Sequence, residues 1–93
     1  MDNNEIMEIA ELFKAFSDST RVKILLSLFE GEKCVGEMVE LVGASQTAVS
    51  HQLSTLKRAH LISGRREGKS IYYSLADAHV KTIINMAIEH VEE

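Results

Sequence analysis

The chain has 93 residues, enough for one domain with a single hydrophobic core and too few for two. Hydrophobic residues make up 45%, as in ordinary globular proteins, and no run approaches the roughly 18 apolar residues that a membrane span needs. The acidic N-terminus lacks the apolar run of a secretory signal, and the single cysteine, Cys34, excludes an internal disulfide. We therefore expect one cytoplasmic domain over residues 1–93, with no membrane partner.

The net charge of −4 argues at first against a nucleic-acid partner, but the charges are unevenly distributed. Residues 45–75 carry a local balance of +4, because five basic residues (Lys57, Arg58, Arg65, Arg66 and Lys69) face one acid, Glu67. The rest of the chain is acidic: −3 over residues 1–16, −2 over 17–44 and −3 over 76–93. This sorting favours one basic, nucleic-acid-binding face. A chance cluster on a solvated surface is the alternative.

Hydrophobic periodicity predicts helices before the basic region. The first covers residues 5–16 and the second follows the cap candidates between Ser17 and Thr20 and ends at Gly31. A short third helix spans residues 35–42. A chain this small is only marginally stable alone, which leaves room for a second copy to supply part of the core.

A tight turn separates the third helix from a fourth one over residues 46–58. In this turn Gly43 can adopt a positive φ and Ser45 can cap the following helix. Val49, Leu53 and Leu56 repeat at the spacing of one buried helix face. Two helices joined by a three-residue turn that contains glycine form a helix-turn-helix pattern.

The periodicity then changes from helix to strand. Residues 61–66 and 70–75 are β-prone runs on either side of Glu67-Gly68-Lys69, which predicts a hairpin with basic residues near its tip. A last helix over residues 77–91 carries one continuous apolar stripe. The predicted fold is therefore mainly α with a β-hairpin: a winged helix-turn-helix of order α-α-α-α-β-β-α, which forms a homodimer through its terminal helices.

The exposed face of the 46–58 helix bears short hydrogen-bonding side chains and no acid, so it can approach DNA without repulsion. Residues in the first turns of such a helix usually enter the major groove, and basic residues suit phosphates. The alternative is that these side chains only cap or solvate the helix. The predicted DNA-binding residues are Gln46, Thr47, Ser50, His51, Ser54, Lys57, Arg58, Arg65, Arg66 and Lys69.

Three segments together resemble the ArsR/SmtB family of metal-responsive repressors, and the resemblance covers nearly the whole chain. They are the second-helix start from Phe16 to Leu25, the recognition helix from Gln46 to Leu56, and the wing from Gly64 to Leu75. Ser19 departs from the family pattern, in which many members have proline. The resemblance implies that Gln46, Thr47, Ser50 and His51 contact bases and phosphates.

Four residues at the two ends of the last helix are candidate metal ligands: Asp77, His79, His90 and Glu93. His79 and His90 are about 16 Å apart along a helix, whereas zinc–nitrogen bonds are about 2 Å long, so one chain cannot close the site. Eleven residues make three turns plus about 20°, so both histidines lie on one flank. Two antiparallel copies that cross near residue 85 would therefore form two identical sites between chains.

Each candidate ligand also has a simpler explanation. Asp77 lies where a helix cap belongs, Glu93 lies at a fraying end, and most surface histidines bind nothing. The resemblance favours a Zn²⁺ site, for which Co²⁺ could substitute, because zinc-sensing members carry Asp-x-His followed by His-x-x-Glu or His-x-x-His at these positions. Soft-metal sensors instead carry Cys-Val-Cys where this chain has Cys34, Val35 and Gly36, so a thiolate site is not expected.

The sequence predicts a repressor that binds palindromic operator DNA as a dimer and releases it when metal binds. The resemblance implies that a site histidine donates to a backbone carbonyl near His60. One alternative is a repressor of the same fold that ignores metal and responds to redox state through Cys34, or to nothing. The other is a metal-buffering dimer with no DNA function. An enzyme is not expected, because the sequence offers no nucleophile–base pair or phosphate loop.

Overall fold

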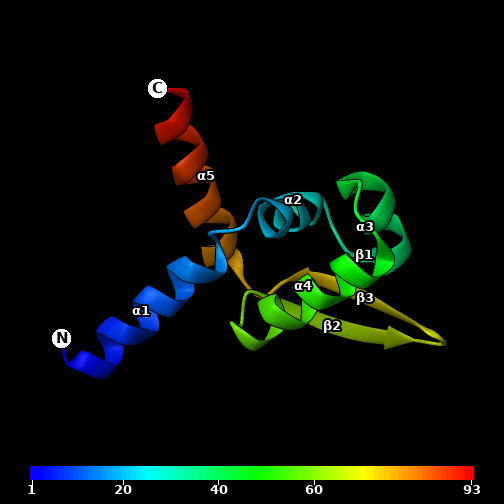
Figure 1. The fold of residues 1–93 in the computed structure, drawn as a ribbon, viewed down its shortest axis with the longest axis horizontal. Coiled ribbons are helices and arrows are strands. Elements are labelled where there is room, and N and C mark those ends of the chain that lie inside the picture. Colours follow the sequence, from blue (N-terminus) through cyan, green and yellow to red (C-terminus); the bar gives the residue numbers. More distant parts are fainter.

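The computed structural model describes residues 1–93 and has the predicted winged helix-turn-helix fold (Figure 1). The elements are α1 (Asn3–Ala15), α2 (Ser19–Ser27), β1 (Lys33–Cys34), α3 (Val35–Val42), α4 (Gln46–Arg58), β2 (Ile62–Glu67), β3 (Ser70–Leu75) and α5 (Ala78–Glu92). No helix is both long and apolar enough to cross a bilayer.

The predicted end of the second helix at Gly31 is wrong, because α2 ends at Ser27 and the N–H groups of Leu28 and Phe29 bond only three residues back, as in turns. At the starts of α1 and α5, aspartate caps move the boundary from the predicted one. Asp2 accepts a hydrogen bond of 2.8 Å from the backbone N–H of Glu5, so α1 begins at Asn3 rather than at residue 5. Asp77 caps α5 by accepting one of 2.9 Å from the N–H of His79, and α5 therefore begins at Ala78.

The sheet contains one strand that the sequence analysis did not predict. β1 is two residues long and pairs antiparallel with β3, which gives three strands in the order β1-β3-β2. A strand this short has no alternating pattern that could be recognised in the sequence. In the wing, β2 and β3 pair from Ile62 with Leu75 to Glu67 with Ser70, and Gly68 in the connecting turn has a φ of 62°.

One hydrophobic core lies between α2, α3, α4, the base of the sheet and one face of α5. Its fully buried side chains include Ile24, Met38, Val49, Leu53 and Leu56. α5 contributes Val80 and Ile84, whereas Ala15 is the only buried residue of α1. Figure 1 shows α1 and α5 projecting from this body on the side away from the wing tip.

Candidate nucleic-acid interface

The turn between α3 and α4 sets the position of the recognition helix. Gly43 adopts a left-handed conformation with a φ of 75°, which reverses the chain after α3. Ser45 caps α4, and its hydroxyl accepts a hydrogen bond of 3.1 Å from the N–H of Ala48. Because Val49, Leu53 and Leu56 are buried, the opposite face of α4 turns to solvent.

The exposed face of α4 carries seven of the predicted DNA-binding residues, and no acid interrupts it. These residues are Gln46, Thr47, Ser50, His51, Ser54, Lys57 and Arg58. Lys57 and Arg58 lie in the last turn, where positive charge complements the helix dipole. α4 can therefore present hydrogen-bonding groups at its start and positive charge at its end to a single ligand.

His60 ends the recognition helix in a left-handed conformation, with a φ of 60°. Its N–H donates to the carbonyl of Lys57, and the N–H of Leu61 donates to that of Leu56, both at 3.0 Å. This pair of bonds is a Schellman motif, which normally places glycine where His60 stands. The motif turns the chain from α4 directly into β2.

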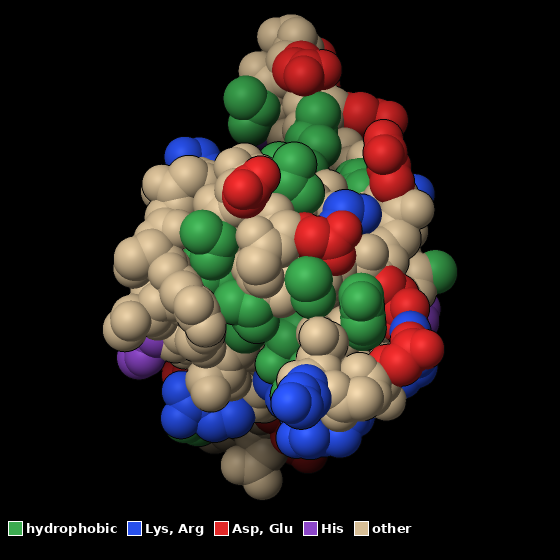
Figure 2. All heavy atoms as spheres, turned by 90° about the vertical axis from the view of Figure 1, so that its right-hand side faces the viewer, with side chains coloured by type: hydrophobic (Ala, Val, Ile, Leu, Met, Phe, Trp, Pro, Cys, Tyr) green, Lys and Arg blue, Asp and Glu red, His purple; other side chains and the backbone are tan.

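Arg66 and Lys69 lie at the outer end of the wing and form no ion pair. Figure 2 shows Lys and Arg side chains gathered towards the bottom of the face that includes the wing tip, with most of that face's acidic side chains above them. α4 and the wing lie at the same level of the molecule in Figure 1. The acidic chain thus has a local basic surface.

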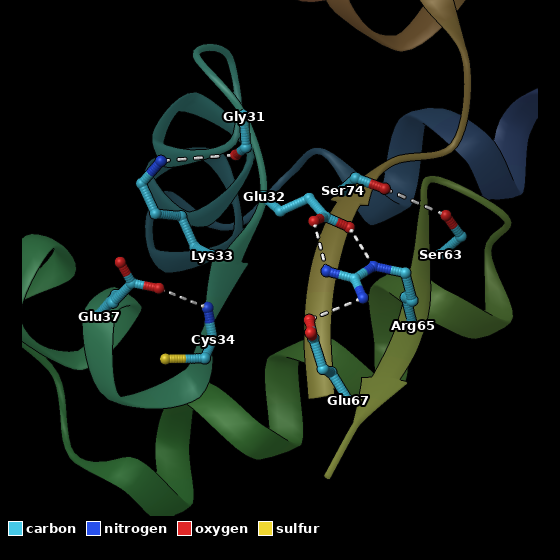
Figure 3. A network of polar contacts seen from close by, with 9 residues as sticks. All are labelled: Gly31, Glu32, Lys33, Cys34, Glu37, Ser63, Arg65, Glu67 and Ser74. Atoms are coloured by element: carbon cyan, nitrogen blue, oxygen red, sulfur yellow. Dashed lines mark hydrogen bonds and ion pairs between the residues drawn. The ribbon is translucent and has the colours of Figure 1, made fainter. Parts of the chain in front are cut away.

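Arg65 differs from its wing neighbours because two carboxylates already bind its guanidinium (Figure 3). It contacts both carboxylate oxygens of Glu32, at 2.9 and 3.1 Å, and one of Glu67, at 2.8 Å. The guanidinium also lies 5.5 Å from the centre of the Tyr72 ring. Its hydrogen bond lowers the pKa of Glu32, and the two carboxylates raise the pKa of Arg65. Glu32 could not be predicted from the sequence, because it lies 33 positions from Arg65 and gives no local signal.

The structure brings two of the four predicted metal ligands together. Nδ1 of His79, whose side chain is 91% exposed, lies 3.4 Å from Oδ1 of Asp77. His90 is in the last turn of α5 and Glu93 follows that helix, so neither can reach the first pair. Within one chain, no three His, Cys, Asp or Glu side chains lie close enough to share a metal ion.

Cys34, the remaining candidate from the sequence, is half-buried at the start of α3. Its backbone N–H donates a hydrogen bond of 3.0 Å to Glu37, which lowers the pKa of that carboxyl group (Figure 3). No second thiol exists in the chain, so a site with two thiolates cannot form within one subunit.

The winged helix-turn-helix fold and the acid-free face of α4 define a DNA-binding protein. Residues 18–63 match the model of the family "Bacterial regulatory protein, arsR family". The chain is 46% identical over 89 residues to a "Cadmium resistance transcriptional regulatory protein CadC homolog" of Staphylococcus aureus, an alignment that covers 94% of this chain and 73% of the relative. It is 36% identical over 93 residues to a "Transcriptional repressor SmtB homolog" of Synechocystis, covering 100% of this chain and 70% of the relative. The chain belongs to the ArsR family.

A solved structure shares the same fold over the whole chain. It is the homodimeric winged helix-turn-helix DNA-binding domain of a possible ArsR-family regulator from Mycobacterium bovis, at 28% identity and a TM-score of 0.88. The match covers 100% of this chain and 88% of that one.

Proposed function

We propose that this chain is a homodimeric repressor that binds palindromic operator DNA and releases it when Zn²⁺ or Co²⁺ bridges the two subunits. Each metal site takes Asp77 and His79 from one subunit and His90 and Glu93 from the other. The observation that carries the proposal is the position of these pairs at the two ends of one helix whose apolar flank is open. α4 would enter the major groove, while Arg66 and Lys69 contact phosphates.

The support for a dimer through α1 and α5 is the apolar surface that one chain leaves uncovered. Phe13, Met86 and Val91 are 59%, 55% and 82% exposed. A hollow of about 360 Å³, lined almost wholly by apolar side chains, lies between the end of α1, α2 and α5. Surfaces of this kind favour a protein partner. The Mycobacterium bovis relative is homodimeric, and a second copy crossing α5 would cover this surface.

The donor set fits a zinc ion. Two imidazoles and two carboxylates are suitable ligands for tetrahedral Zn²⁺. Oδ1 of Asp77 caps α5, whereas Oδ2 makes no hydrogen bond and is free to bind a metal. The name of the Staphylococcus aureus relative links that protein to cadmium resistance, which supports a metal effector here. When bound, the metal would supply the cross-link that selects one dimer shape.

The backbone carbonyl of His60 is the proposed route from the metal site to the recognition helix. It accepts no hydrogen bond in the structure, so a site histidine of the partner subunit can donate its second N–H to it. Metal would then stabilise a dimer with mismatched half-site spacing. Because such coupling is reciprocal, operator DNA should weaken metal binding by the same factor.

Operator-binding isotherms with and without Zn²⁺ test the proposal. The wild-type dimer should release a palindromic site that it has itself selected from random-sequence duplexes, whereas His79→Ala and His90→Ala should stay bound. His60→Asn is the control, because it removes a histidine outside the ligand set and asparagine tolerates the left-handed backbone. Zinc binding without operator binding would favour a metal buffer. Unchanged operator binding in zinc would favour a repressor that ignores metal.

A mixed dimer tests whether each site spans two subunits. In a heterodimer of His79→Ala with His90→Ala, one predicted site loses both histidines and the other keeps both. Zinc should therefore bind at one site per heterodimer, although it binds neither homodimer tightly. Sites built within single chains would instead all remain damaged in the mixture, and that result would contradict the inter-subunit arrangement.

A further inference from the structure

α1 is attached to the rest of the chain only through its last turn. Ala15 is its only buried residue, and Ile6 and Met7 near its start are exposed. A hollow of about 1100 Å³ lies between α1 and the second half of α4, with Glu8 and Leu12 on one side and Arg58 and His60 on the other. The angle between α1 and α4 therefore depends on the junction that follows Ala15.

The side chain of Arg21, on α2, occupies this junction and joins three helices. Its Nε donates to the carbonyl of Ala15 at 2.7 Å, and a terminal nitrogen donates to that of Lys14 at 3.3 Å. Both acceptors belong to the last turn of α1, where helix carbonyls lack partners within the helix. The other terminal nitrogen donates to Oε1 of Gln52, on α4, at 2.8 Å.

The geometry of this contact, rather than its charge, gives it a positioning role. Arg21 forms no ion pair, so all its acceptors are neutral. The guanidinium is a rigid planar fork, and it fixes the directions of its partners more strictly than an ammonium group can. Gln52 is half-buried, one residue before the core residue Leu53, and therefore does not belong to the exposed DNA-binding face.

We propose that Arg21 and Gln52 are positioning residues that set the angle between α1 and the recognition helix, and through it the half-site spacing that the dimer reads. The inference rests on the proposed dimer, in which α1 packs against the partner. α1 has 13 residues and is about 20 Å long, so a small rotation at its attached end moves its far end by several ångströms. Motion imposed by the partner on α1 is passed to α4 through this pair.

Gln52→Leu tests the proposal, because it removes the acceptor from α4 while Arg21 keeps its bonds to α1. The probe is the palindrome selected by the wild-type dimer, prepared also with the half-sites one base pair closer and one base pair farther apart. The ratio of the affinity for the selected spacing to the affinity for either altered spacing should fall about fivefold, the equivalent of one net hydrogen bond. Binding to random-sequence duplex should stay unchanged. Gln52→Glu keeps an acceptor and should restore the preference.

Ser54→Ala is the matched control on the exposed face of the same helix, and it should weaken binding to all three spacings equally. If Gln52→Leu lost affinity equally for every spacing, the role of Gln52 would be purely stabilising and the inference would be overturned. An unchanged preference for the selected spacing would overturn it too. A wild-type chain that binds none of the duplexes would instead overturn the proposed function. The two failures are therefore distinguishable.

Discussion

The two arginines of the wing, Arg65 and Arg66, should differ in what they contribute to the salt dependence of DNA binding. The logarithm of the affinity falls as the logarithm of the salt concentration rises, and each phosphate that a protein neutralises makes this slope steeper by about 0.9. Arg66 forms no ion pair with a carboxylate, so it can contact a phosphate. Arg66→Ala should therefore remove one phosphate contact per subunit and make the slope less steep by about 1.8 for the dimer. Over a fourfold range of salt this amounts to about a tenfold smaller loss of affinity.

Arg65→Ala should leave the same slope nearly unchanged. Its guanidinium already neutralises Glu32 and Glu67, so a move to a phosphate would leave both carboxylates unpaired. The variant should instead weaken binding by a similar factor at every salt concentration, since the wing loses its tie to Glu32, the residue before β1.

Fluorescence anisotropy of a labelled duplex between about 50 and 200 mM salt measures these slopes. Lys23→Ala is a matched control, because it removes an exposed positive charge from α2 rather than from the wing. A slope that falls as far for Arg65→Ala as for Arg66→Ala would refute the reasoning. It would mean that Arg65 leaves its two carboxylates to contact DNA.

Four further substitutions test stability, which is measured by urea unfolding. Ser45→Ala removes the cap of α4 and should lower the free energy of unfolding by about 1 kcal/mol; no change would mean that the cap bond of 3.1 Å contributes nothing. Gly43→Ala should also cost about 1 kcal/mol, because the φ of 75° is strained for alanine although no atom lies within 4 Å of the added Cβ. Gly36→Ala, inside α3 and equally unobstructed, should stabilise by about 0.5–1 kcal/mol, and the same sign for both glycines would contradict the conformational explanation. The pKa of Glu32 is lowered from its ordinary value of 4.5, so its contribution to stability is present above pH 4.5 and is lost as the pH falls through the lowered pKa. In Glu32→Gln the free energy of unfolding should therefore fall less steeply towards acid pH than in the wild type. Parallel profiles of the two proteins against pH would contradict this.

The elements that carry the predicted DNA-binding surface could be predicted because their signals are local. The helical spacing of Val49, Leu53 and Leu56 fixes which face of α4 is buried, and therefore which face is free. Gly43 and Ser45 mark the turn within three residues, and Gly68 marks the tip of the wing. Each of these features is decided by neighbours in the sequence, so an isolated sequence is enough to find them.

The contacts that distinguish one basic residue from another could not be predicted. Arg65 meets Glu32 across 33 positions, and Arg21 meets Gln52 across 31. Only the folded chain brings these pairs together. β1 was missed for a related reason, because its two residues pair with β3 and have no pattern of their own. The sequence therefore predicts a set of basic residues. The structure distinguishes Arg66 and Lys69, which form no ion pair, from Arg65, which Glu32 and Glu67 already bind.

For the proposed metal ligands, helix geometry alone limits where a site can form. Three turns of α5 separate His79 from His90, so a shared ion needs a second copy of the chain. The same copy is needed by α1, since a helix of 13 residues with one buried side chain is marginal by itself. In the proposed dimer, metal binding and the stability of α1 therefore depend on one interface. Arg21 joins that interface to α4, so a change in dimer shape has a direct mechanical path to the surface that reads DNA.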